Sequence, residues 1–216
     1  MKHKFITVVL LAFMIHLKAG KNNIFSHDTY SNDLIFKDKD YGTKIAFLKN
    51  KQLGQFAQLF LDNSKNLYTG DNPKNFIDYL IKNKDQKIWG CDFKNKLDIM
   101  SCTINKNLVG FVCFLKQTEN CKNYDFSNQA DGAKVGYIAL LCVNKNYRQQ
   151  KIGTLLISSA LEELCLREDV RHVTILTTLD NLPAQNLFAK IGFEKVKEDK
   201  VKNTALYKKI WIVKRN

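Results

Sequence analysis

An alternation of apolar strands and helices between residues 135 and 191 constrains the fold of this 216-residue chain more than any other feature. The pattern predicts a strand at Val135–Val143, a helix from Ile152 to about Arg167, a strand at His172–Leu179 and a helix at Leu182–Ile191. Strands that alternate with helices are joined by crossover connections, which make neighbouring strands parallel. The second half of the chain therefore predicts an α/β fold with a partly parallel sheet.

The first half of the chain adds two helices and several antiparallel strands. A short strand suits Lys44–Leu48, and apolar residues at helical spacing predict helices at Lys51–Leu61 and from Pro73, after the cap residues Asp71 and Asn72, to about Asn83. Segments rich in β-forming residues predict strands at Ile88–Phe93, Leu97–Ile104 and Leu108–Leu115, the last two joined by a hairpin at 105–107. Two further strands are expected at 193–196 and 205–213.

The length suits one α/β domain with a full core. We expect this domain at residues 43–216, after a polar linker or arm at 20–42. Residues 117–134 form a long polar connection, which either borders a substrate cleft or is an exposed insertion without a function.

The loop that joins the strand at 135–143 to the following helix has the features of an anion site. The first turn of a helix offers unpaired N–H groups and the positive end of the helix dipole, so the backbone from Gln149 to Leu155 could hold a phosphate or pyrophosphate. Gly153 permits close approach, and Arg148 and Lys151 add positive charge. By itself this spacing is also typical of an ordinary capped helix with a basic, solvated loop.

Two motifs in this half resemble those of the GNAT superfamily of N-acetyltransferases. Its first motif, Arg/Gln-x-x-Gly-x-Gly/Ala, cradles the pyrophosphate of acetyl-CoA, and residues 148–153 (RQQKIG) occupy that pattern. Residues 180–193 (DNLPAQNLFAKIGF) are similar to the second signature, an Asn followed by an Ala-rich helix that ends in Gly-Phe. The resemblance covers roughly residues 43–213. It implies an α/β (α+β) GNAT fold with a central mixed twisted sheet of about six to seven strands flanked by about four helices.

The resemblance also assigns a site for acetyl-CoA and an unidentified amine acceptor. Three residues would present backbone groups to the pantetheine arm between two splayed strands: Leu141, Cys142 and Val143. Six would bind the pyrophosphate: Arg148, Gln149, Lys151, Ile152, Gly153 and Thr154. Asn181 would bond the pantetheine and Phe188 would lie close to the thioester. The implied reaction is attack of a neutral amine on the thioester carbonyl, polarised by an N–H near Val143.

Three positions depart from the family pattern. Lys151 stands where the first glycine is expected, and Phe188 where many relatives have a tyrosine that protonates the leaving thiolate. Tyr137 lies near the position of a glutamate base in many relatives. The catalytic candidates are Tyr137, Val143 and Phe188. A base could instead act through water or come from Glu119, Asp125 or Asp131. Tyr207 either reaches the cleft as a substitute tyrosine or packs against its strand neighbours.

The net charge of +13 does not by itself predict nucleic-acid binding. Only four of the 34 basic residues are arginines, whereas bidentate recognition of bases and phosphates favours arginine. We therefore expect no nucleic-acid partner. With four histidines and no CxxC pair, no metal-ligand spacing stands out either.

Residues 1–19 have the pattern of a secretory signal peptide, with Lys2 and Lys4 before the apolar run Phe5–Leu17. This predicts a secreted or exported protein, or a cytoplasmic one if the segment is not a signal; a membrane is a partner only if the segment stays uncleaved. Export would permit disulfides, of which Cys91 with Cys102, or either with Cys121, is the most plausible. The other three cysteines lie in apolar runs that favour buried free thiols: Cys113, Cys142 and Cys165.

The sequence thus supports an acetyl-CoA-dependent N-acetyltransferase that acts on a primary amine of a small molecule or a protein. The alternative is an acyl-CoA-binding module with weak or lost catalysis that serves as a sensor or interaction protein. The missing tyrosine and glutamate keep this alternative open. Oligomeric state is not predicted.

Overall fold

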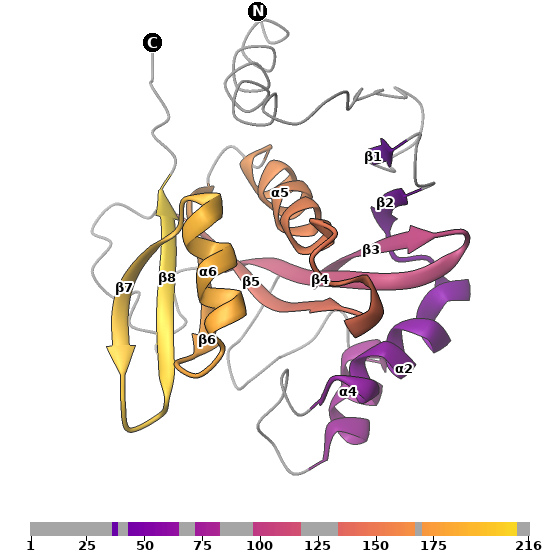
Figure 1. Ribbon diagram of the computed structural model, residues 1–216, viewed down its shortest axis with the longest axis horizontal. Helices are drawn as coiled ribbons and strands as arrows, with labels where there is room; N and C mark the ends of the chain where they lie inside the picture. The colour runs from indigo at the N-terminus through magenta and orange to yellow at the C-terminus, as the bar shows by residue number, and fades with distance from the viewer. Residues whose placement is uncertain are drawn as a thin grey trace, which may run out of the picture.

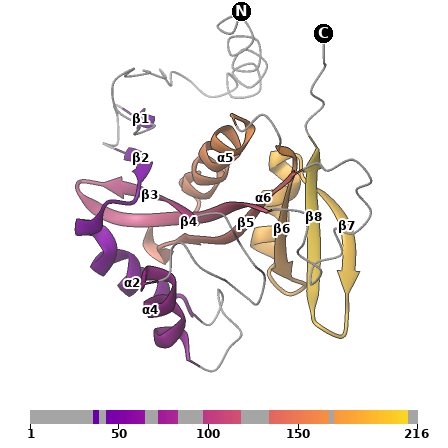
Figure 2. The same cartoon turned by 180° about the vertical axis from the view of Figure 1, so that it is seen from behind.

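The computed structural model describes six segments of the chain, and the remaining residues are not described (Figure 1). The described segments are residues 36–38, 43–64, 72–82, 97–117, 134–166 and 170–210. They form one sheet with helices on both faces, and Figure 2 shows the same arrangement from behind.

Eight strands lie in the order β1-β2-β3-β4-β5-β6-β8-β7. Their bounds are β1 Phe36–Asp38, β2 Thr43–Phe47, β3 Asp98–Ile104, β4 Asn107–Gln117, β5 Lys134–Val143, β6 Val170–Thr178, β7 Glu194–Asp199 and β8 Thr204–Ile210. All neighbours pair antiparallel except β5 and β6, which are parallel because helix α5 connects them. The mixed sheet confirms the predicted fold class, and the short edge strand β1 adds to the expected six to seven strands.

The helices divide between the two faces of the sheet. Their bounds are η1 Asn50–Gln52, α2 Leu53–Asp62, α4 Pro73–Lys82, η2 Lys145–Tyr147, α5 Ile152–Cys165 and α6 Leu182–Ile191. Side chains of α5 and α6 join one buried cluster, whereas those of α2 and α4 join a second one. The cofactor motifs therefore lie on the α5/α6 face, and helices α2 and α4 lie on the other. Among the described residues no helix is long and apolar enough to cross a membrane.

Local sequence signals explain several element boundaries. Asn105 and Lys106 both have positive φ, which makes the β3–β4 connection a tight two-residue hairpin turn. Helix α4 begins where predicted, because the Asn72 side chain accepts the Asn75 N–H at 3.0 Å and Pro73 follows. Gly192, at φ 88°, ends α6 in the left-handed conformation that glycine adopts without strain.

Several predictions fall outside the described residues. These are the signal peptide at 1–19, the strand at Ile88–Phe93, the connection at 117–134 apart from its first and last residues, Cys91 and Cys121. Strand β1 lies within the segment expected as a polar arm, where it pairs with β2.

The described cysteines correct two expectations. Cys102, a candidate for a disulfide, is a buried free thiol whose pKa burial raises to about 12. Cys113 and Cys142 are buried and free as predicted, whereas Cys165 is exposed because it is the last residue of α5.

Candidate functional site

The loop before α5 folds into a cradle of unpaired N–H groups. In the described part of the chain the six backbone N–H groups from Gln149 to Thr154 have no hydrogen-bond partner, and the first paired one is that of Leu155, which donates to the Lys151 carbonyl at 3.0 Å. Gln149 and Lys151 have φ values of 63° and 61°, so left-handed residues curve the loop into the concave form that binds anions. The predicted pyrophosphate site therefore has suitable donors at the positive end of α5.

Gly153 lets this cradle approach helix α6. A Cβ atom at Gly153 would lie 3.2 Å from the Leu187 Cδ2 atom, closer than ordinary van der Waals contact. A larger side chain here would press against α6 and occupy space beside the free N–H groups.

Arg148 serves the fold in a way that sequence analysis missed. Its Nε donates to the Val143 carbonyl at 3.2 Å, and its Nη2 donates to the Asn63 Oδ1 atom at 3.1 Å. Asn63 caps the C-terminus of α2, and its Nδ2 donates to the Leu59 carbonyl at 2.9 Å. The guanidinium thus joins the cofactor loop to helix α2 on the opposite face of the sheet, while its predicted contact with pyrophosphate stays a prediction.

Strands β5 and β6 separate beside this cradle. Their pairing ends at Ile138 and Ile175, although β5 continues to Val143 along β4 and β6 continues to Thr178 along β8. A bulge at Ala139 coincides with the point of separation, since Cys113 pairs with Leu140 but Phe114 pairs with Ile138. The open edge of β5 is the splayed gap that the pantetheine arm was expected to enter.

Backbone direction selects which β5 residues face this gap. Asn144 donates its N–H to the Val109 carbonyl of β4 at 2.8 Å. Because N–H groups alternate in direction along a strand, Cys142 also points its N–H toward β4, whereas Leu141 and Val143 point theirs into the gap. Leu141 and Val143 therefore fit their predicted role as pantetheine and thioester donors. Cys142 does not, because its N–H is directed at β4 and its side chain is buried among the α2/α4 cluster.

Helix α6 forms the other wall of the site. Asn181 is the N-cap residue, and its Oδ1 accepts the Ala184 N–H at 3.3 Å. Its amide nitrogen has no described partner, so it can still donate to a pantetheine carbonyl. Phe188 is 3% exposed and packs against Phe193 and Tyr207, with ring centroids 6.1 and 5.5 Å away. Its described contacts are thus with the core.

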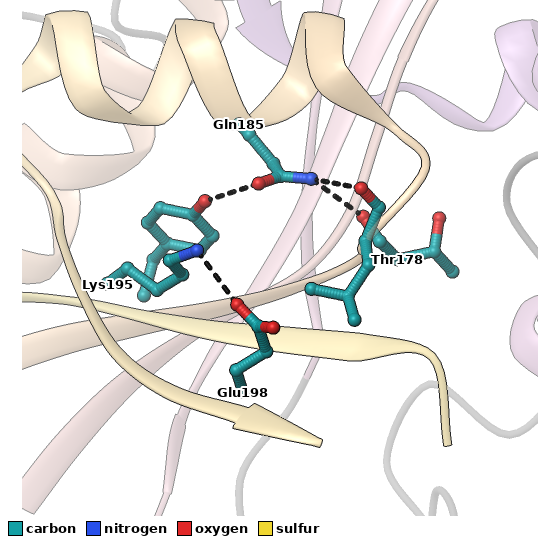
Figure 3. Close-up of polar contacts among 6 residues, drawn as sticks. Thr178, Gln185, Lys195 and Glu198 are labelled. Atoms are coloured by element: carbon teal, nitrogen blue, oxygen red, sulfur yellow. Dashed lines mark hydrogen bonds and ion pairs between the residues drawn. The ribbon is translucent and has the colours of Figure 1, made fainter. Parts of the chain in front are cut away.

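The two tyrosines considered for catalysis lie on opposite faces of the sheet. Tyr137 is 3% exposed within the α2/α4 cluster, together with Leu140. Side chains alternate between the two faces of a strand, so residues three apart, such as Tyr137 and Leu140, would normally lie on opposite faces. They share a face of β5 because the bulge at Ala139 lies between them. Tyr207 packs on the α5/α6 face, where its hydroxyl donates to the Gln185 Oε1 atom at 2.9 Å (Figure 3). The prediction that Tyr207 packs against its neighbours is the one that the geometry supports.

Burial makes two other ionisable groups unsuitable as bases at neutral pH. Burial raises the pKa of Cys142 to about 12 despite the opposing charge of Arg148, so the thiol stays protonated. Burial, and then the charge of Lys208, lower the pKa of His172 to about 4, and this residue lies at the start of β6, away from the gap. No cluster of potential metal ligands occurs within the described segments. Glu119, Asp125 and Asp131 lie outside them.

The comparison with protein families gives a match to the acetyltransferase (GNAT) family over residues 58–193. The chain is 29% identical over 93 residues to N-alpha-acetyltransferase 30 of Dictyostelium discoideum, an alignment that covers 43% of this chain and 44% of that protein. The chain thus matches less than half of that relative's length.

Solved structures share the fold at low sequence identity. Arabidopsis thaliana NAA60 in complex with acetyl-CoA has a TM-score of 0.60 and 16% identity, with 78% of this chain and 98% of that one covered. PaiA N-acetyltransferase from Thermoplasma acidophilum in complex with coenzyme A gives 0.53 and 15%, over 78% and 99%. The family match spans the cradle, the gap and α6 together, and it supports the predicted enzyme class and its cofactor, acetyl-CoA. The chain belongs to the GNAT acetyltransferase family.

Proposed function

We propose that this chain is an acetyl-CoA-dependent N-acetyltransferase that acts on the N-terminal α-amine of a polypeptide. The observation that carries the proposal is that six N–H groups at residues 149–154, which have no partner among the described residues, lie beside an open edge of β5. The polypeptide acceptor is inferred from the similarity to N-alpha-acetyltransferase 30. This narrows the wider expectation of a primary amine on a small molecule or protein.

The chain's own groups would hold and orient the donor. Acetyl-CoA supplies an acetyl group activated as a thioester. The cradle would bind its pyrophosphate, with Lys151 adding charge, and Leu141 and Val143 would donate N–H groups to the part that enters the gap. The Val143 N–H would polarise the thioester carbonyl, and fixed donors of this kind stabilise developing negative charge without reorganising.

Tyr137 is the candidate base because it lies on β5, on the face that carries α2 and α4. Its phenol could relay the amine proton through water. Phe188 has no donor, so protonation of the leaving thiolate would fall to solvent or to the acceptor. We expect Tyr137→Phe to lower kcat at least about tenfold while the Kd for acetyl-CoA stays within twofold. An unchanged kcat would remove Tyr137 from the mechanism.

The direct test uses full-length protein, acetyl-CoA and matched peptides. One set of peptides has a free α-amine and no lysine, and the other has a blocked N-terminus and one lysine. Mass spectrometry should show acetylation at the α-amine of the first set. Acetylation confined to lysine would overturn the assignment of the acceptor. Binding of acetyl-CoA without transfer to any peptide would favour the alternative, a sensor or interaction module.

A further inference from the structure

A chain of hydrogen bonds that the proposed mechanism does not use joins β8 to the open end of β6 (Figure 3). Tyr207 Oη and Gln185 Oε1 are 2.9 Å apart. The Nε2 atom of Gln185 lies 2.7 Å from the carbonyl oxygen of Leu179 and 3.3 Å from that of Thr178. Three elements therefore meet through one side-chain amide on the first turns of α6.

The geometry determines which atom donates in each of these hydrogen bonds. The atom of Gln185 that faces two carbonyl oxygens must be the amide nitrogen, because only it carries hydrogens. The amide oxygen then faces Tyr207 and accepts its hydroxyl proton. Tyr207 is 4% exposed and its ring packs edge-on against Phe188, so its one donor is committed within the core. This arrangement leaves Tyr207 no proton to give to a leaving thiolate.

The anchored segment is the part of β6 that borders the gap. Beyond Ile175 this strand has no partner on β5 among the described residues, while its pairing with β8 continues to Thr178 and Gln185 ties its end to α6. Gln185 holds the last β6 residue, Thr178, and its successor Leu179 against α6. The Thr178 carbonyl also accepts the N–H of Asn181, the residue predicted to bond pantetheine.

We propose that Tyr207 and Gln185 are positioning residues that set the width of the β5–β6 gap and the direction of the Asn181 side chain. They act on the pantetheine part of acetyl-CoA through the end of β6 and do not touch it. The phosphate cradle, on the loop before α5, is outside their influence. The inference rests on acetyl-CoA as the cofactor and does not depend on which amine is acetylated.

Calorimetric titration of the full-length protein with two ligands tests this. Acetyl-CoA probes both the cradle and the gap, whereas 3′-phosphoadenosine 5′-diphosphate has the nucleotide and pyrophosphate but no pantetheine. We expect Tyr207→Phe and Gln185→Met each to raise the Kd for acetyl-CoA about 5- to 10-fold. The Kd for the nucleotide should stay within twofold. The Kd of the double variant for acetyl-CoA should be no higher than that of the weaker-binding single variant, because both changes break the same series of hydrogen bonds.

Two control variants separate positioning from a general loss of stability. Ser101→Ala removes a buried hydroxyl that donates to the Ala46 carbonyl at 3.3 Å, on strands far from the gap. Glu198→Gln breaks the exposed ion pair between Glu198 and Lys195 (Figure 3). Lys195 is on β7, where it pairs with Tyr207 of β8. Neither control should change the Kd for either ligand.

Three results would overturn the inference: an unchanged Kd for acetyl-CoA in both variants, an equal weakening of both ligands, or wild-type protein that binds acetyl-CoA no more tightly than the nucleotide. A failure of peptide acetylation with this pattern of binding intact would reject the proposed function alone.

Discussion

Lys151 stands in a backbone conformation that favours glycine, and its replacement by glycine should stabilise the protein. The residue has φ 61° and ψ 6°, in the left-handed region. This conformation destabilises the folded state of a residue with a Cβ atom by roughly 1–2 kcal/mol. Glycine avoids this strain, but its greater freedom in the unfolded chain costs roughly 0.5–1 kcal/mol on folding. The expected net gain for Lys151→Gly is about 0.5–1 kcal/mol, which corresponds to about 1–4 °C in Tm for a domain of this size.

Lys151→Ala is the matched control, because it removes the same charge but keeps the Cβ atom. Urea unfolding monitored by circular dichroism should rank glycine above both lysine and alanine. The two variants should lose acetyl-CoA affinity equally if only the lysine charge contributes to binding. Equal stability of the glycine and alanine variants would refute the argument that the loop is strained at this position.

Two further predictions concern the stability of the fold. Arg148→Lys and Asn63→Ala each break the link between α2 and the cofactor loop, so each should cost about 0.5–1 kcal/mol in urea unfolding. Their double variant should cost less than the sum; strict additivity would show that the link is not formed. The pKa of His172 is about 4 in the folded protein, below its unfolded value near 6.5, so the unfolded chain binds the extra proton between these values. The contribution of His172 to the free energy of unfolding should therefore be fully present above pH 6.5 and should be lost as the pH falls toward 4. His172→Gln should flatten this pH dependence. A flat pH dependence in the wild-type protein would contradict a buried neutral imidazole.

The sequence predicted those elements whose ends carry local chemical signals. Helix α6 has the predicted bounds, because Asn181 caps its start and Gly192 ends it. The hairpin at Asn105 and Lys106 was likewise predicted from residues that suit a tight turn. The strands around the cofactor site followed from their long apolar runs, and the family resemblance gave the sheet as a whole.

Features that depend on contacts between distant segments were not predicted. The bulge at Ala139 arises from pairing with β4, and nothing in the local sequence marks it. Arg148 was expected to bind phosphate, but its partner Asn63 lies 85 residues away in the sequence. Nothing in the sequence distinguishes Gln185 from the polar helix residues that are usually solvated, and only the folded chain brings Tyr207 and the end of β6 to it.

Binding of acetyl-CoA by the cradle and the gap can be measured by titrating the full-length protein and two glycine variants with acetyl-CoA. Gly153→Asp places a carboxylate among the free N–H groups and presses on Leu187, whereas Gly54→Asp is the matched control at an exposed site of α2 with nothing within 4 Å. If the cradle holds the pyrophosphate, wild-type and Gly54→Asp protein bind acetyl-CoA and Gly153→Asp does not, while circular dichroism shows that all three are folded. Equal binding by Gly153→Asp, or no binding by folded wild-type protein, would contradict this placement of the pyrophosphate.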